Sequence, residues 1–203
     1  MDVREPESAA EVRAGRELTV RAWAEGYGDI LSPDALSTIE EVTLDQDFEQ
    51  EHAEFTGSEV DNRAFVAVED DGERSSTTVV GWATLVRDDE WTSEFVGEDE
   101  AELRACYVEP GYQGTGVGGA LVEAVLSRVP AGRDRLVLEA FEAHDESREF
   151  YEARGFEPRE TGEIVVFGES NPSVVYEPCA RISRRIRVVD GRPVSSTSIS
   201  NVS

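Results

Sequence analysis

The chain has 203 residues, of which 39% are hydrophobic, and it carries a formal net charge of −25. This length is enough for one domain with a buried core, and this hydrophobic content is too high for a disordered chain. The acidic balance, without a basic stripe to neutralise phosphates, argues against direct binding of nucleic acid.

All 19 basic residues are arginines, and acidic residues occur along the whole sequence. Such a surface repels itself in dilute salt, and concentrated salt screens the repulsion. The composition therefore predicts adaptation to a high-salt cytoplasm, such as that of a halophilic archaeon. The alternative is an acidic surface that recruits basic partners.

The N-terminus and the cysteines argue against a secreted, membrane-spanning or metal-binding protein. Residues 1–8 lack an apolar signal core, and no run approaches the ~20 apolar residues that a membrane-spanning helix needs. Cys106 and Cys179 do not have the spacing of metal ligands, and their positions imply no disulfide. We therefore expect a cytoplasmic protein with no membrane association and no metal.

Two helices are predicted at the start of the chain. Ser8 and Glu11 fit a capping box, so the first helix should begin there and run to about Ala24. Ser32 and Pro33 are typical of the N-cap and first position of a second helix.

The middle of the chain predicts strands. Residues 45–62 are acidic and weakly patterned, and no element is expected there. Two β-rich runs follow at 64–69 and 79–87, and a third strand is expected from 102 to 108.

The second half alternates helices and strands. Apolar residues at helical spacing begin at Val117, and a strand is expected at 136–141. Asp145 can cap a helix to Arg154, which Gly155 would close in the left-handed conformation. Further strands are expected at 156–167, 173–177 and 182–189, whereas the last dozen residues have a composition typical of disorder. The chain therefore belongs to the mixed α/β class.

The most informative segment is VEPGYQGTGVGGAL, from Val108 to Leu121. Four glycines, Gly114, Gly116, Gly118 and Gly119, follow an expected strand and open an expected helix, so unpaired backbone N–H groups should gather at the N-terminus of that helix. Such a place binds phosphate, because the donors are free and the helix dipole is positive there. The segment predicts a ligand that carries phosphate.

Two known nucleotide-binding patterns, the dinucleotide fingerprint and the P-loop, also place glycines before a helix. Gly114, Gly116 and Gly119 match the dinucleotide pattern G-x-G-x-x-G, and Glu139 follows 20 residues later. However, residues 109–113 separate the first glycine from its strand, and about 100 residues precede the motif. A dinucleotide-dependent oxidoreductase remains a remote alternative. A P-loop needs a lysine after its last glycine, and the chain has none.

A third pattern is more specific. The segment CYVEPGYQGTGVGGAL resembles the acetyl-CoA signature Q/R-x-x-G-x-G/A of the GNAT N-acetyltransferase superfamily, with Gln113, Gly116 and Gly118 on the signature positions. FYEARGF at 150–156 resembles the family's F-Y-x-x-x-G-F. RAWAEGYGDIL at 21–31 resembles its first helix and substrate loop. The resemblance covers roughly residues 3–178.

The resemblance implies a GNAT fold, an α+β arrangement with a twisted, mixed, mostly antiparallel sheet and helices on both faces. Residues 1–180 would form one domain, and 181–203 a C-terminal extension. The implied reaction is direct acetyl transfer from acetyl-CoA to a primary amine of a small molecule, a peptide or a protein, without a metal. A homodimer is possible, as dimers are frequent in the family. The functional alternative is a non-catalytic acyl-CoA-binding or regulatory module.

The resemblance also implies the residues that hold the cofactor. The Gln113 side chain and the amides of the glycine loop would bind the pyrophosphate, while Gly119 lets the helix pack closely. In GNAT proteins the preceding strand splays from its neighbour, and pantetheine pairs with its backbone in the gap. The predicted cofactor residues are Cys106, Val108, Gln113, Gly114, Thr115, Gly116, Val117, Gly118, Gly119, His144 and Tyr151.

Catalytic roles follow from the same comparison. Tyr151, in the F-Y-x-x-x-G-F motif, would donate a proton to the departing thiolate. Glu102 is the leading general base, and strand alternation predicts that it shares a side with Cys106 and Val108; alternatively it caps an acidic run or binds substrate. His144 stands where members often carry Asn, so a pantetheine contact, a base and an uninvolved loop histidine all remain open.

The acceptor is less well defined. The family shapes it with the loop after the first helix and the loop before the cofactor strand, here 23–31 and 88–101. Tyr27 and Trp91 are the candidate lining residues. Arg148 and Arg154 could reach phosphates of coenzyme A or pair with nearby glutamates.

Overall fold

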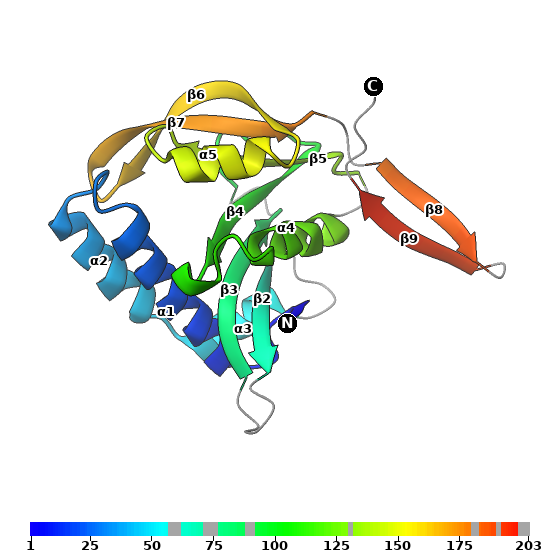
Figure 1. The fold of residues 1–203 in the computed structure, drawn as a ribbon, viewed down its shortest axis with the longest axis horizontal. Helices are drawn as coiled ribbons and strands as arrows, with labels where there is room; N and C mark the ends of the chain where they lie inside the picture. The colour runs from blue at the N-terminus through cyan, green and yellow to red at the C-terminus, as the bar shows by residue number, and fades with distance from the viewer. Residues whose placement is uncertain are drawn as a thin grey trace.

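The computed structural model describes residues 1–56, 62–70, 77–87, 92–129, 132–179, 183–189 and 192–198, the last two ranges by their backbone. Helices and strands are mixed along the chain (Figure 1). In chain order the elements are β1 (Asp2–Arg4), α1 (Ala9–Gly26), α2 (Pro33–Leu44), α3 (Phe48–Phe55), β2 (Arg63–Asp70), β3 (Thr77–Val86), β4 (Glu100–Val108), the 3-10 helix η1 (Pro110–Tyr112), α4 (Val117–Arg128), β5 (Arg135–Phe141), α5 (Asp145–Glu152), β6 (Phe156–Val166), β7 (Glu169–Pro178), β8 (Ser183–Val189) and β9 (Arg192–Ser198).

Within the described residues the main sheet has seven strands in the order β1-β2-β3-β4-β5-β7-β6. Neighbouring strands run antiparallel except β4 and β5, which are parallel. The connection between β4 and β5 is α4, as a crossover between parallel strands requires. The predicted mixed, mostly antiparallel sheet is confirmed.

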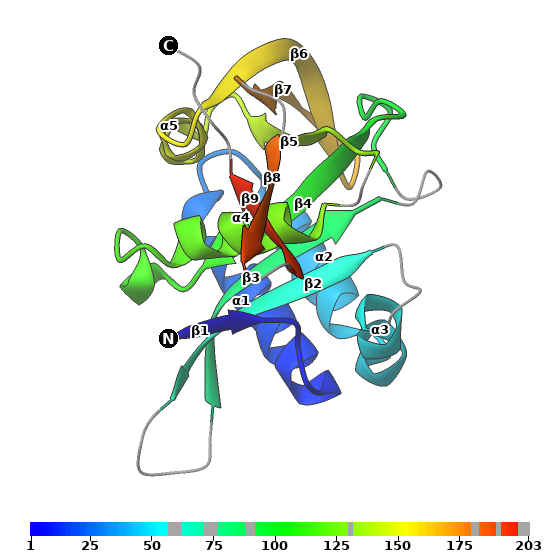
Figure 2. The same ribbon diagram turned by 90° about the vertical axis from the view of Figure 1, so that its right-hand side faces the viewer.

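Helices cover both faces of this sheet, which Figure 2 shows from the side. On one face, Leu121 of α4 packs with Phe65 and Leu103 in the largest core cluster. On the other face, Leu18 of α1 packs with Val66 and Trp82 in a second cluster. The predicted helices on both faces are therefore confirmed, and the apolar strands between them are buried from two sides.

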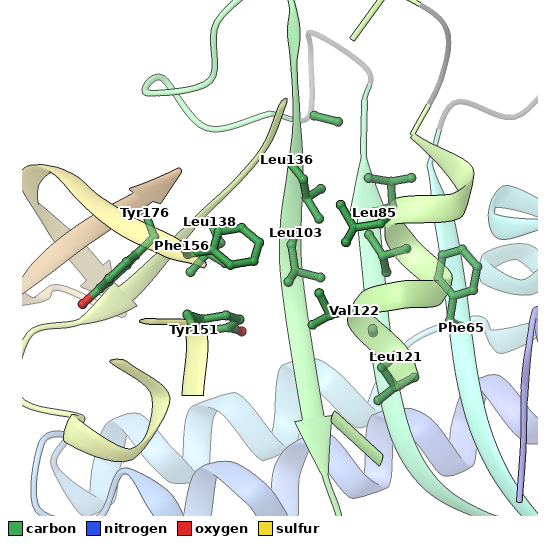
Figure 3. Close-up of a cluster of buried hydrophobic side chains, with 14 of the residues drawn as sticks. Phe65, Leu85, Leu103, Leu121, Val122, Leu136, Leu138, Tyr151, Phe156 and Tyr176 are labelled. Atoms are coloured by element: carbon green, nitrogen blue, oxygen red, sulfur yellow. The ribbon is translucent and has the colours of Figure 1, made fainter. Parts of the chain in front are cut away.

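The largest cluster extends past β4 to α5 and the far strands. Tyr151 of α5, Phe156 of β6 and Tyr176 of β7 belong to it, together with Leu138 of β5. Figure 3 shows these four side chains on one side of β4, and Leu121 and its neighbours on the other. This continuity fixes α5 relative to β4, which matters because both elements line the site.

The helix ends test the capping predictions. Ser8 and Ser32 are N-caps, and each side chain accepts from a first-turn amide, as predicted. Gly155 has φ of 79°, as expected after α5. The N-cap of α5 is His144 rather than Asp145, because the imidazole Nδ1 accepts the Ser147 amide at 3.2 Å. The prediction missed this because histidine is not a preferred capping residue.

Besides the short helix η1, three elements were not expected from the sequence. The strand β1 is too short to show alternation. The helix α3 lies in the acidic stretch, capped by Asp47, and packs Phe48 and Phe55 against the cluster that contains Trp82. The strand β9 pairs with β8 within the last dozen residues, where disorder was expected. In that segment the β-branched Val194 and Thr197 favour an extended chain.

A β-bulge interrupts the pairing of β4 with β3. Thr84 pairs with Ala105 and Leu85 with Leu103, so Arg104 is the extra residue. The bulge shifts by one position the alternation of β4 side chains between the two faces of the sheet. Leu103 and Cys106 consequently both pack on the cluster beneath α4, whereas Ala105 packs on the cluster beneath α1.

Candidate active site

The strands β4 and β5 separate soon after they begin. Their parallel pairing covers Glu100–Glu102 and Arg135–Val137. From Leu138 onward β5 pairs with β7 on its other side, while β4 continues to Val108 paired with β3. The backbone of β4 around Cys106 therefore faces a gap in the sheet, in the described part of the chain.

The glycine loop follows the end of β4. The Glu109 amide donates to the Val80 carbonyl at 3.0 Å, and η1 then turns the chain. Gly114 and Gly116 have φ of 72° and 96°, a region that favours glycine. Gly116 is the N-cap of α4 and offers no side chain to cap it. The first amides of α4 are thus available to an anion, with the positive end of the helix dipole behind them.

A cavity of about 390 Å³ lies between this loop, the gap and α5. Most of the predicted cofactor residues meet here. The lining residues are Cys106, Val108, Gln113, Gly114, Gly116, Gly118, His144, Glu146, Ser147, Phe150, Tyr151 and Arg154.

Three predicted residues do not line this cavity, as far as the described residues define it. Val117 is buried in the core. The Thr115 hydroxyl donates to the Tyr112 carbonyl at 2.6 Å, and its amide bonds the same carbonyl at 3.3 Å. A Cβ on Gly119 would lie 3.2 Å from Nη2 of Arg154, in accord with a packing role.

Among the loop glycines, Gly118 lies closest to a neighbouring side chain. A Cβ there would lie 2.9 Å from Cε2 of Phe150, which α5 contributes to the cavity. Nearby, the guanidinium of Arg154 lies 3.6 Å from the centroid of the Phe150 ring, and its Nη1 donates to the Phe150 carbonyl. Free amides, a bare glycine and a guanidinium on one cavity fit the phosphates of coenzyme A.

A second cavity, of about 290 Å³, opens on the α1 side of the gap. Five aromatic residues line it, and four of them pack on one another: Trp23, Tyr27, Tyr107 and Phe141, with Tyr151 as the fifth. Cys106, Ser147 and Tyr151 line both cavities. The gap between β4 and β5 is therefore where the two cavities meet, and Ser147 is a residue of this junction that the sequence did not single out.

Tyr151 occupies the junction with a side chain that is almost wholly buried. It packs edge-on against Phe150 and Phe156, at centroid distances of 5.0 and 5.8 Å. Burial raises the pKa of Tyr151 well above its usual value. The phenol stays protonated at neutral pH, which suits a proton donor.

Cys106 also faces the junction. Burial raises the pKa of its thiol to about 12, against a smaller opposing effect of the Arg154 charge. The thiol is therefore protonated at neutral pH and is a poor nucleophile.

Glu102 lines the second cavity, but its surroundings differ from those expected. Both carboxylate oxygens accept from Arg104, at 2.8 Å each, and both accept from Ser93, at 3.0 Å each. The bulge also places Glu102 on the opposite side of β4 from Cys106. The predicted shared side is wrong, because simple alternation does not allow for the extra residue at Arg104.

A second carboxylate in this cavity was missed. Glu139 of β5 lies across the gap and lines the cavity with Phe141. Its Oε1 accepts a short hydrogen bond from the Ser173 hydroxyl of β7. The sequence pointed to Glu139 only as part of the dinucleotide pattern. Its position beside the gap between β4 and β5 depends on the order of the strands in the sheet.

Of the remaining candidates that the structure describes, only Tyr27 lines one of the two cavities. Tyr27 lines the second cavity as expected, and Trp91 lies outside the described residues. Arg148 forms an ion pair at 3.3 Å, but its partner is Asp145 rather than one of the glutamates expected from the sequence. Among the residues that the structure describes, no group of acidic, histidine or cysteine side chains could hold a metal, and no helix is long and apolar enough to cross a membrane.

Comparison with solved structures gives a consistent fold. The PaiA N-acetyltransferase of Thermoplasma acidophilum, solved with coenzyme A, is 19% identical, with a TM-score of 0.67 over 88% of this chain and 99% of that one. A GCN5-related N-acetyltransferase of Rhodopseudomonas palustris is 18% identical, with a TM-score of 0.61 over 87% and 94%. The Escherichia coli ribosomal-protein-S18-alanine N-acetyltransferase is 17% identical, with a TM-score of 0.52 over 87% and 92%.

The comparison with curated proteins gives no match. A family model, by contrast, matches residues 25–156, which include most of the substrate-loop segment, the glycine loop and the F-Y-x-x-x-G-F motif. This match spans well over half of the chain and agrees with the splayed strands and the free N-terminus of α4. The chain belongs to the acetyltransferase (GNAT) family.

Proposed function

We propose that the protein transfers an acetyl group from acetyl-CoA directly to a primary amine, with both substrates bound together. The observation that carries this proposal is the junction at Tyr151 and Cys106, which both line the cofactor cavity and the aromatic cavity. A thioester in one cavity and an amine in the other would meet there.

The first cavity would hold coenzyme A. Amides at the start of α4, the Gln113 side chain and Arg154 would bind phosphates, and the free backbone of β4 at Cys106 and Val108 would bind pantetheine. The bound cofactor supplies the acetyl thioester. An N–H of β4 that faces the gap would polarise its carbonyl, because a fixed donor in a buried site stabilises developing negative charge.

The amine must lose a proton before or during attack. We assign the role of proton acceptor to Glu139, whose Oε1 accepts a hydrogen bond from the Ser173 hydroxyl. Glu102, the candidate from the sequence, has both carboxylate oxygens held by Arg104 and Ser93, so they are less available to an amine. Glu102 remains the second candidate, because it lines the same cavity.

Tyr151 would protonate the departing thiolate. Replacing it with Phe keeps the ring in the core and removes only the hydroxyl. Tyr151→Phe should lower kcat by about 100-fold, because general acid catalysis is worth that order, while the affinity for acetyl-CoA stays within about threefold. Turnover and calorimetric binding of the two proteins test this together. Unchanged binding with no turnover in either protein would favour a non-catalytic acyl-CoA-binding module.

The surface charge supports a second, independent proposal. A net charge of −25 without lysine fits a protein of a high-salt cytoplasm, since salt screens the self-repulsion. The melting temperature should then rise as potassium chloride is added. A melting temperature independent of salt would contradict this proposal.

The domain limits are likewise a proposal. Residues 1–180 would form the catalytic domain, and 181–203 would be an extension that the reaction does not need. A chain truncated after residue 180 should keep its melting temperature and turnover. This expectation holds for a monomer and for a homodimer alike, and light scattering distinguishes the two. Loss of either property on truncation would contradict these limits.

A further inference from the structure

A third cavity, of about 210 Å³, lies between the end of α1, the end of β4 and the start of α5. It adjoins both cavities of the proposed site, the cofactor cavity and the aromatic acceptor cavity. Within the described residues, Cys106 and Ser147 are the two that line all three cavities. The place where the cavities meet is therefore bounded by these two side chains, and the function proposed above gives Ser147 no part.

Ser147 and Tyr151 lie four residues apart on α5, so their side chains share one face of that helix. Both line the cofactor cavity and the acceptor cavity. The backbone of Ser147 is fixed, because its amide donates to Nδ1 of the N-cap His144 at 3.2 Å. The helix α5 thus presents two hydroxyl groups where a thioester would meet an amine.

The position of Ser147 in its helix leaves its hydroxyl available. A hydroxyl inside a helix often donates to a carbonyl of the preceding turn, as Thr19 of α1 does to the Gly15 carbonyl at 2.9 Å. Ser147 lies in the first turn of α5, so no helical turn precedes it. Its hydroxyl proton can therefore be directed toward the junction.

Tyr27 favours the same direction for this proton. Burial raises the pKa of Tyr27, against a smaller opposing effect of its hydrogen bond with the Ser147 side chain. The phenol is therefore protonated at neutral pH. A phenol donates more readily than an aliphatic hydroxyl and accepts less readily, so we expect Tyr27 to donate and Oγ of Ser147 to accept. A serine oxygen that accepts in this way still has its own proton for a ligand.

We propose that Ser147 is a second hydrogen-bond donor to the sulfur of the acetyl thioester, beside Tyr151. As the amine attacks, the C–N bond forms, the C–S bond breaks, and the electron pair of the C–S bond stays on sulfur. Ser147 donates a hydrogen bond to this growing charge and keeps its proton, while the amine proton goes to Glu139 and the sulfur takes its proton from Tyr151. A donor that is already in place stabilises such charge without reorganisation. The inference rests on the proposed function for the reaction, but the contact with sulfur can be measured without turnover.

Calorimetric binding of coenzyme A in the absence of an amine tests this contact. At a pH of about 9.5 an alkyl thiol is mostly ionised, so coenzyme A presents a thiolate, whereas desulfo-coenzyme A presents no sulfur. Ser147→Ala should weaken binding of coenzyme A about tenfold at this pH, because a hydrogen bond to a charged group is a strong one. Binding of desulfo-coenzyme A should stay within about threefold. Ser147→Thr keeps the hydroxyl and should recover most of the affinity, and Ser127→Ala, at an exposed position of α4, is the matched control.

Turnover gives a second readout. With an amine that the wild type acetylates, Ser147→Ala should lower kcat about tenfold and leave both KM values within about threefold, as loss of a contact made in the transition state does. Equal weakening of coenzyme A and desulfo-coenzyme A would show that Ser147 only shapes α5, and would overturn the donor role. Undiminished kcat together with undiminished coenzyme A binding would also overturn it and leave the acetyltransferase standing. A loss confined to coenzyme A supports the sulfur contact even if no amine is acetylated.

Discussion

The ring of Tyr27 stacks on the imidazole of His144, with centroids 4.6 Å apart and planes inclined by 27°. Tyr27 ends α1 and lines the acceptor cavity, while His144 caps α5 and lines the cofactor cavity. One aromatic pair thus joins the two sides of the site. The same imidazole accepts the Ser147 amide through Nδ1, so its orientation is fixed from two directions.

His144→Ala removes both the cap and the stack. We expect the free energy of unfolding to fall by about 1–2 kcal/mol and the KM for acetyl-CoA to rise, because α5 frays where it lines the cavity. His144→Asn restores a capping acceptor and should recover most of the stability. Thermal unfolding and steady-state kinetics check both variants. Equal stability of the Ala variant and the wild type would show that the cap contributes nothing.

Gly118→Ala should weaken coenzyme A binding by about tenfold or more, because the new Cβ would meet the Phe150 ring at 2.9 Å. The ring would move into the cavity or the helix away from it. Gly111→Ala is the matched control, since a Cβ there meets nothing within 4 Å. Calorimetric titration with coenzyme A and with NAD measures the affinity of the wild type and of both variants for each ligand. Normal coenzyme A binding by the Gly118 variant, or binding of NAD by the wild type, would contradict the assigned cradle.

The two carboxylates of the acceptor cavity can be distinguished by pH and by substitution. Glu139→Gln should lower kcat by about 100-fold, as loss of a general base does, while acetyl-CoA affinity is kept. Glu102→Gln should disturb the Arg104 pair, and its effect should fall mainly on KM for the amine. A pH profile of kcat for each protein makes the comparison. The reverse pattern, with kcat lost only in the Glu102 variant, would return the base to the residue that the sequence suggested.

Cys106 should play no covalent part. Because its thiol pKa is about 12, the thiolate fraction at pH 8 is about one in ten thousand, and reactivity should rise about tenfold per pH unit up to pH 12. Iodoacetamide should therefore modify the exposed Cys179 first. Cys106→Ala should retain kcat within about threefold. An acetylated Cys106, detected by mass spectrometry before the amine is added, would contradict direct transfer.

Much of this site could be predicted from short segments of the sequence. The glycine loop, the strand before it and the helix after it depend on backbone conformation and helix termini, which short segments determine. Gly116 at the start of α4 and Gly155 after α5 adopt the left-handed values that their positions require. The fold followed as well, since the order of elements and the two motifs indicated it.

What the sequence could not supply depends on pairing between distant segments. The extra residue at Arg104 is visible only against the register of β3, and it reverses the side of Glu102. Glu139 reaches the acceptor cavity because β5 leaves β4 to pair with β7. The aromatic lining gathers Trp23 from α1, Tyr107 from β4 and Phe141 from β5, and the contact among these three residues depends on the packing of α1 on the sheet.

The release of free coenzyme A thiol from acetyl-CoA, measured with and without an amine, tests the central claim most directly. Wild-type protein at high potassium chloride should release thiol in proportion to acetylated amine, and Tyr151→Phe should do so about 100-fold more slowly. If the wild type binds acetyl-CoA but releases thiol at the same background rate with every amine in a broad set, the junction at Tyr151 does not carry acetyl transfer.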